Sequence, residues 1–403
     1  MQLFFLCHVI KHLVSELLVS DLLVISLLVE KMDKLFVFGK TVSGDAFTDR
    51  EKETEKLVAN FKYGINTFIV SPRRWGKTSL VKKAKGLAEG PKLKIVYVDV
   101  QHCHSREEFC ERFASAVLTQ TAGKMDEWVE NARSFLSRFS IGINASPDPT
   151  GELSLRLNMS PKERSMEELL QLPERIAQKK GVRVVVCIDE FQQIGNYPDS
   201  LRFQAELRSV WQHHQQASYC LFGSRKHLME SLFDDTSKPF YKFGDIIYLQ
   251  RIPLEYWVKY ITSKFKQEGK SITRKQSEWI VNQVDGNSSY VQQLAWYVFL
   301  RTAKKVGETI LREAFDELVD QCADVFEAKT EGLTAYQMNY LRAVADGIND
   351  GLSSSQTISN YNLGSSANVA IIMKSLLEKD LIQKIDKQIF LTDPIMGHWI
   401  KRT

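Results

Sequence analysis

The sequence predicts an α/β fold with a five-stranded parallel sheet, helices on both of its faces, a following helical module and a C-terminal winged helix. First, short β-branched and aromatic runs alternate with helical segments up to about residue 250, which is typical of a doubly wound parallel sheet. Second, the pattern from about 254 to 326 is helical throughout. Third, three helical segments and a β-ribbon follow residue 334. The five predicted strands are 65–70, 94–100, 182–190, 217–224 and 245–249.

A chain of 403 residues exceeds one typical hydrophobic core, so we expect several domains. We predict an α/β core over 32–252, an α-helical lid over 253–330 and the winged helix over 334–403. Between about 122 and 165 two alternating segments flank a Pro-Asp-Pro-Thr-Gly turn, which predicts a surface β-hairpin inserted into the core.

Residues 1–31 form an apolar extension ahead of the core, although four charged residues interrupt it. No uncharged window reaches the length of about 20 residues that a membrane span requires, and no basic start or small-residue cleavage site indicates a secretory signal. We therefore predict no transmembrane span. Residues 32–39 resemble the usual start of a known protein family, which implies that Met32 is the initiator. The alternative is an amphipathic helix that docks on a partner or on a membrane surface.

The net charge of +4 is spread along the chain, so composition favours neither a nucleic-acid nor a membrane partner. The six cysteines lack the spacing of a disulfide framework, which favours a cytoplasmic location. His102, Cys103, His104 and Cys110 lie close in sequence, but their spacing matches none of the usual zinc-ligand pairs, and a strand-end loop followed by a helix is the preferred interpretation.

The segment after the first predicted strand has the sequence of a phosphate-binding loop. Such a loop points backbone N–H groups at the β- and γ-phosphates of a nucleotide, at the positive end of a helix. Gly76 permits close approach, Lys77 supplies a charge for the outer phosphates, and the Thr78 hydroxyl completes the coordination of Mg²⁺. The predicted nucleotide-binding residues of the loop are Ser71, Pro72, Arg73, Arg74, Trp75, Gly76, Lys77, Thr78 and Ser79.

This loop departs from the usual GxxxxGK[ST] pattern, because Ser71 stands where the first glycine is usual and Pro72 follows it. The end of the pattern that holds the phosphates is present, but the loop has one flexible residue fewer than usual. Since a lone Gly-Lys-Thr often arises by chance, the assignment depends on the flanking strand and helix and on a second motif.

That second motif is an apolar run that ends in two carboxylates at Asp189 and Glu190. A continuous apolar run is typical of a parallel strand buried on both faces, and with the acidic pair it forms a Walker B pattern. We predict that Asp189 holds Mg²⁺, mostly through its water shell, and that Glu190 polarises the attacking water. The alternative is an ordinary core strand followed by a solvated acidic turn.

Ser224 is the last residue of the fourth predicted strand. The carboxyl ends of parallel strands meet at the same crevice, so Ser224 is predicted to face the γ-phosphate and to sense it. A plain strand end with a serine turn is the alternative.

Four segments of the sequence together resemble the archaeal-type ATPase family of the AAA+/STAND group. They are 47–53, 71–78, 188–191 and 222–224, and the resemblance extends from about residue 35 to the end of the chain. It implies that the nucleotide is ATP and that Asp49, Arg50 and Glu51 lie beside the adenine. It also implies a sensing element in the lid, Gly286 to Tyr290, in which Ser288 stands where the family has proline.

The predicted winged helix suggests a partner, which is DNA or a protein. The module carries seven basic and six acidic residues, and its third helix offers only Asn368, Lys374 and Lys379 as polar readers. DNA affinity depends largely on neutralising phosphates, so this module is poorly equipped for tight DNA binding alone. Contact with DNA and packing on the ATPase core or on a protein partner both remain open.

We predict a Mg²⁺-dependent ATPase in which Lys77 binds the phosphates, Glu190 activates the attacking water and Ser224 senses the γ-phosphate. Thr78 and Asp189 hold the metal. Hydrolysis would change the angle between core, lid and winged helix. The alternative is a nucleotide-dependent switch or DNA-binding regulator with low turnover, which has no need of a general base at Glu190. The transition-state arginine is Arg73, Arg74, Arg225 or Arg251, or comes from a neighbouring copy after self-association.

Overall fold

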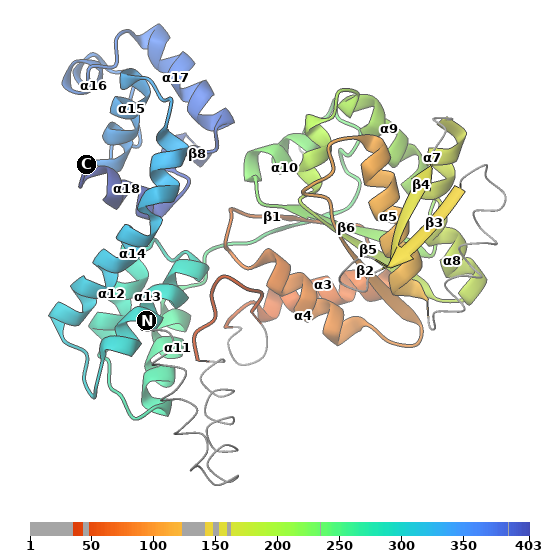
Figure 1. The fold of residues 1–403 in the computed structure, drawn as a ribbon, viewed down its shortest axis with the longest axis horizontal. Coiled ribbons are helices and arrows are strands. Elements are labelled where there is room, and N and C mark those ends of the chain that lie inside the picture. Colours follow the sequence, from red (N-terminus) through yellow and green to blue (C-terminus); the bar gives the residue numbers. More distant parts are fainter. Residues whose placement is uncertain are drawn as a thin grey trace, which may run out of the picture. The chain divides into compact units, whose positions relative to one another are not determined.

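The computed structural model of the protein describes residues 35–42, 48–122, 142–147, 153–158, 163–233, 235–385 and 387–403 (Figure 1). The apolar extension 1–31, with the predictions made for it, lies outside this part of the chain. Two compact units are present, one made of Asp49–Ile252 with Val319–Thr403 and the other of Met1–Thr48 with Pro253–Leu318. None of the described helices is long and apolar enough to cross a lipid bilayer.

The larger unit is built on a five-stranded sheet in which all strands are parallel and follow the order β2-β5-β6-β1-β7. This arrangement confirms the predicted α/β fold class. The central strands are buried along almost their whole length because helices cover both faces of the sheet. The strands are β1 (Thr67–Val70), β2 (Leu93–Asp99), β5 (Arg183–Asp189), β6 (Ala217–Gly223) and β7 (Asp245–Tyr248).

Figure 1 shows α3 (Glu51–Tyr63) and α4 (Lys77–Ala88) on one side of the sheet. The opposite side carries a core of valines from the strands and large aromatic side chains from the helices, including Phe113, Phe203 and Trp211. Side chains alternate along a strand, so this core takes Val96 and Val98 of β2 and leaves the odd-numbered residues to face α4. The helices on the core side are α5 (Arg106–Thr121), α7 (Glu163–Leu170), α8 (Leu172–Lys180), α9 (Ser200–Trp211) and α10 (Lys226–Phe233).

A buried carboxylate fixes the start of β6. Oε2 of Glu174, in α8, accepts hydrogen bonds from the backbone N–H groups of Gln215, Gln216 and Ala217 at 3.1, 2.9 and 2.8 Å. Burial alone would raise the pKa of Glu174, but these bonds and one from the Gln178 side chain outweigh it, so the pKa lies below its usual value. The ionised carboxylate therefore stabilises the fold.

We expect Glu174→Gln to lower the free energy of unfolding by about 2 kcal/mol at neutral pH, because three backbone donors lose a charged acceptor. Since the pKa of Glu174 is lowered in the folded state, its contribution is present above the unfolded pKa and is lost as the pH falls through the folded one. Thermal denaturation of both proteins at pH 7 and below about pH 4 checks this, because the difference should shrink at the lower pH. An equal difference at both pH values would contradict it.

The predicted insertion contains a β-hairpin, because β3 (Gly142–Pro147) and β4 (Leu153–Asn158) pair antiparallel. The C-terminal module has three helices, a two-stranded ribbon and a closing helix, and each helix begins at a capping Thr, Ser or Asp side chain. The elements are α15 (Ala335–Ala345), α16 (Ser355–Tyr361), α17 (Ser366–Glu378), β8 (Ile382–Ile385), β9 (Gln388–Leu391) and α18 (Pro394–Ile400).

The smaller unit is helical, as predicted for a lid. Gly286, at φ 65°, and the capping Asn287 separate its second and third helices. Phe36 packs edge-on against Tyr260 and Phe265, so the segment ahead of the sheet joins the core of this unit. The helices are α11 (Leu254–Gln267), α12 (Arg274–Gln283), α13 (Ser288–Arg301) and the first part of α14 (Glu308–Thr330), which ends in the larger unit.

Candidate functional site

The predicted site residues of the larger unit meet at one edge of the sheet. The loop 71–76 follows β1, Asp189 ends β5, and Ser224 follows β6. Because these strands are parallel neighbours, their carboxyl ends lie at the same edge of the sheet, the place predicted for the nucleotide crevice. Segments far apart in sequence therefore place hydroxyl, ammonium and carboxylate groups together.

The loop adopts the left-handed backbone conformation at Arg74 (φ 64°) and Gly76 (φ 90°). Gly76 directly precedes α4, so the N–H groups of the first turn of the helix are presented to the crevice. Ser71 is 1% exposed and does not have a positive φ, so a side chain is tolerated where the usual pattern has glycine.

Lys77 is buried beneath this loop. Its Nζ donates to the backbone oxygens of Ser71 and Pro72 at 3.1 and 2.8 Å. Burial lowers the pKa of Lys77 to about 8, although the nearby Glu190 and Asp189 carboxylates act in the opposite direction. A phosphate at the mouth of the loop would add further negative charge beside this ammonium and favour its charged form.

Thr78 and Asp189 lie in direct contact, with Oγ1 of Thr78 donating to Oδ2 of Asp189 at 3.0 Å. Asp189 is 7% exposed, and burial, together with the neighbouring Glu190 charge, raises its pKa above the usual range despite its hydrogen bonds. A hydroxyl and two adjacent carboxylates are hard oxygen donors, and the acidic pair favours a bound cation. These residues fit Mg²⁺.

Glu190 and Ser224, predicted as general base and sensor, also touch one another. Oε2 of Glu190 accepts hydrogen bonds from Oγ of Ser224 at 2.9 Å and from Nε2 of Gln192. Glu190 has a φ of 55°, at the start of the 3₁₀ helix η2 (Phe191–Asn196). Oγ of Ser224 in turn accepts from Nε of Arg73 at 3.2 Å, so the phosphate loop and the sensor position are linked.

Both arginines of the loop also face acidic groups of the winged helix. Nε of Arg73 lies 3.7 Å from Oδ2 of Asp380, which follows α17, and Nη1 of Arg74 lies 3.6 Å from Oδ2 of Asp393, the cap of α18. Among the other candidate arginines, Arg251 stacks over the ring of Trp75 with its Cζ 5.9 Å from the centroid. The loop is therefore surrounded by side chains from elsewhere in the same unit.

Asp49 and Arg50 lie directly ahead of α3, both with positive φ angles of 56° and 87°. Arg50 is 4% exposed, and its Nη1 pairs with Oε1 of Glu53, in the first turn of α3, at 2.8 Å. The structure thus gives Arg50 a local partner, and the adenine-side position of Asp49, Arg50 and Glu51 stays a prediction. The lid element Gly286 to Tyr290 lies in the smaller unit.

Two residues of the site were missed by sequence reasoning. The Tyr97 hydroxyl donates to Oδ2 of Asp189 at 2.5 Å, and the Gln192 side chain donates to Glu190. The only signal for Tyr97 in the sequence is its alternation with Asp99, which places it on the α4 side of β2. Its pairing opposite Cys187, two residues before Asp189, requires the register of the sheet.

Comparison with solved structures shows the same fold in other proteins. The Walker-type ATPase PABY2304 of Pyrococcus abyssi superposes with a TM-score of 0.64 at 18% identity, over 91% of this chain and 99% of that one. The ORC2 protein of Aeropyrum pernix, in ADPNP and ADP complexes, superposes with a TM-score of 0.55 at 14% identity, over 92% and 97%. A search of curated proteins found no match.

Two family models match the sequence itself. A model described as a probable winged helix domain matches residues 324–402. A model described as an ATPase domain predominantly from Archaea matches residues 47–294, which is more than half of the chain and includes the phosphate loop, the acidic pair and Ser224. The protein therefore belongs to this family of archaeal-type ATPase domains and carries a C-terminal winged helix.

Proposed function

We propose that the protein binds ATP at the crevice and hydrolyses it in a Mg²⁺-dependent reaction. The observation that carries this proposal is the convergence of Lys77, Thr78, Asp189, Glu190 and Ser224 at the carboxyl ends of three neighbouring parallel strands. In this arrangement an ammonium, two hydroxyls and two carboxylates lie at the start of one anion-binding helix. Displacement of the bound fluorescent analogue mant-ATP by ATP and by GTP tests which nucleotide the site prefers.

The residues divide the chemistry between them. Lys77 and the N–H groups at the start of α4 would bind and orient the phosphates, while Thr78 and Asp189 would hold Mg²⁺. When bound, Mg²⁺ neutralises charge on the phosphate oxygens. Glu190 would accept a proton from the attacking water and fix its direction. Ser224 would donate to the γ-phosphate once its hydrogen bond to Glu190 is exchanged.

A second function is favoured by the contacts of Glu190. Its Oε2 is held by Ser224 and Gln192, so the carboxylate has to leave these donors before it can act as a base. This supports a low-turnover switch in which Glu190 remains bound to these donors and bound ATP itself sets the conformation. Phosphate release measured with and without duplex DNA and candidate proteins separates the two functions, because a switch would show negligible turnover in every case.

We also propose that nucleotide binding changes the position of the winged helix, in the manner of a STAND-type protein. A movement of the lid would follow. The ion pairs of Arg73 with Asp380 and of Arg74 with Asp393 support the first of these steps, because phosphate and aspartate would compete for the same guanidinium groups. Release of the winged helix would then accompany ATP binding.

The ion pair of Arg73 suggests a direct test. Asp380 has a φ of 57°, which asparagine tolerates well, so Asp380→Asn removes the charge and keeps the shape. An exposed pair is worth about 0.2–1 kcal/mol, so mant-nucleotide affinity is expected to rise by up to about fivefold. Asp350→Asn, a charge-matched change at an exposed site of the same module, is the control. Equal affinities for the two variants would refute the coupling.

For the winged helix, the structure favours a protein surface over DNA as partner. The Asn368 side chain, one of the three predicted readers, donates to the backbone oxygen of Leu363 and serves the local fold. Ile371 on the same helix is 68% exposed, and Asp380 after it faces the ATPase core. An apolar exposed residue on a helix with few charges suits protein contact better than a phosphate backbone. A gel-shift titration at two salt concentrations tests for DNA.

A further inference from the structure

We propose that Tyr97 positions Asp189 for Mg²⁺ binding by connecting the edge of the sheet to the metal site. The proposal rests on the proposed function, because it assigns a role toward the metal that the reaction needs. Tyr97 lies outside both sequence motifs of the site. Four residues, Gln120, Phe222, Lys82 and Asp189, contact its backbone, its ring and its hydroxyl.

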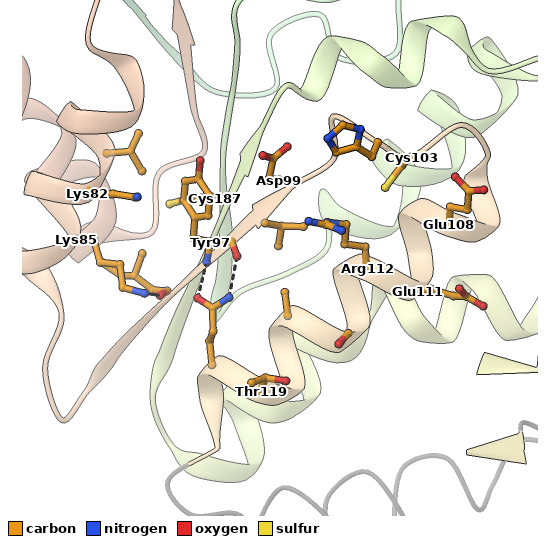
Figure 2. Close-up of a pocket in the computed structure, with 17 residues that line it drawn as sticks. Lys82, Lys85, Tyr97, Asp99, Cys103, Glu108, Glu111, Arg112, Thr119 and Cys187 are labelled. Carbon is orange, nitrogen blue, oxygen red and sulfur yellow. Dashed lines mark hydrogen bonds between the residues drawn. The ribbon is translucent and has the colours of Figure 1, made fainter. Parts of the chain in front are cut away.

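The backbone of Tyr97 is clamped by one side chain. β2 is an edge strand of the described sheet, so its odd-numbered residues turn their N–H and C=O groups away from β5. Gln120 of α5 satisfies both groups of Tyr97, accepting from its N–H at 2.9 Å and donating to its oxygen at 2.7 Å. The amide of Gln120 thus takes the place of a neighbouring strand at this point, as the two dashed bonds in Figure 2 show.

The backbone of Ile95, the preceding odd-numbered residue of β2, is held by side chains in the same way. The N–H of Ile95 donates to Glu89 at 3.0 Å, and its oxygen accepts from Nζ of Lys85 at 2.5 Å. A cavity of about 830 Å³ lies along this edge, lined from α4, β2 and α5. Side chains and not a further strand therefore hold the edge of the sheet in register beside the cavity.

The ring and the hydroxyl of Tyr97 connect this edge of the sheet to the proposed metal site. The ring lies 6.2 Å from that of Phe222 in β6, and Nζ of Lys82 lies 5.7 Å from its centroid. The hydroxyl donates to Oδ2 of Asp189 at 2.5 Å, the same oxygen that accepts from Thr78 at 3.0 Å. Two hydroxyl donors from different elements therefore hold one carboxylate oxygen in place. Because the carboxylate group is rigid, they also set the direction in which Oδ1 points.

A donor that orients a metal ligand changes metal affinity more than it changes nucleotide affinity. Loss of such an outer partner typically weakens metal binding by about 10–100-fold. Tyr97→Phe keeps the ring and its packing and removes only the hydroxyl. We expect it to weaken Mn²⁺ or Mg²⁺ binding about tenfold, to raise the Mg²⁺ concentration needed for half-maximal ATP hydrolysis by the same factor, and to leave metal-free mant-ATP binding unchanged.

The matched control is Tyr219→Phe. Tyr219 is buried in β6, and its hydroxyl bonds to Nδ1 of His214 at 2.8 Å and not to a site residue. The full-length variants are titrated with Mn²⁺ in the presence of ADP and followed by electron paramagnetic resonance of the free ion, which needs no turnover. Thermal denaturation verifies that each variant is folded.

The outcomes separate this proposal from the function on which it rests. A wild type that binds neither mant-ATP nor Mn²⁺·ADP would refute the proposed function. A wild type that binds both, with Tyr97→Phe equal to it in Mn²⁺ affinity, would refute the role of Tyr97 alone. Weakening by Tyr219→Phe to the same extent would also refute it, since a general loss of sheet stability would then explain the effect. Gln120→Leu, which frees the backbone of Tyr97, is expected to weaken Mn²⁺ binding in the same direction.

Discussion

Replacement of Lys77 by alanine is expected to weaken ATP binding by about 100-fold. The Lys77 ammonium is buried and donates hydrogen bonds to the backbone oxygens of Ser71 and Pro72. These bonds hold it where it can bind an anion at the loop. Charge-assisted hydrogen bonds to phosphate contribute about 1.5–3 kcal/mol each, and removal of this group also leaves the two loop oxygens without their donor. A loss of about 3 kcal/mol corresponds to about 100-fold in affinity.

Equilibrium titration with mant-ATP measures this loss. Lys83→Ala, a change of the same charge and size on the same helix, is the matched control, because Lys83 lies farther along α4 from the loop. The control should bind as the wild type does. Equal binding by Lys77→Ala and the wild type would mean that the nucleotide does not sit on this loop, and the site would have to be sought elsewhere.

The second large effect is expected for Glu190→Gln. The change is isosteric and leaves an amide oxygen that can still accept from Ser224, so the local structure should persist. It removes the proton acceptor, and general base catalysis contributes about 10²–10⁴-fold. We therefore expect turnover to fall by at least about 100-fold while mant-ATP affinity stays within about a factor of two.

Steady-state phosphate release and mant-ATP titration give the two quantities. Glu206→Gln in α9 is the control, because its carboxylate pairs with Arg202 and Arg106 on another part of the unit. A parallel loss of ATP binding in Glu190→Gln would show that Glu190 serves binding or stability and not the chemical step. Retention of full turnover would show that another group accepts the proton.

The sequence was sufficient to predict the parts of the site that are local. Strand, loop and helix follow one another at 67–88, and the acidic pair ends a buried apolar run, so each motif carries its own structural context. The departure at Ser71 is explained by backbone geometry, since the left-handed angles fall on Arg74 and Gly76 instead. A pattern of residue types does not reveal which loop positions need a positive φ.

The contacts that join distant segments could not be predicted in the same way. The reach of Tyr97 to Asp189 depends on the register between β2 and β5, and a shift of one residue would turn Tyr97 to the other face. The ion pairs of Arg73 and Arg74 depend on how the winged helix docks, and nothing in the charges of the loop names Asp380 or Asp393 as partners.

A single-turnover experiment tests most directly whether this site hydrolyses ATP with Glu190 as the base. Excess protein is mixed with radiolabelled ATP and Mg²⁺, and the bound nucleotide is separated as ATP or ADP over time. The wild type is expected to convert bound ATP to ADP, while Glu190→Gln binds the same amount and keeps it as ATP. A wild type that binds ATP and leaves it intact throughout, with or without DNA and candidate partners, would contradict the claim and favour the switch.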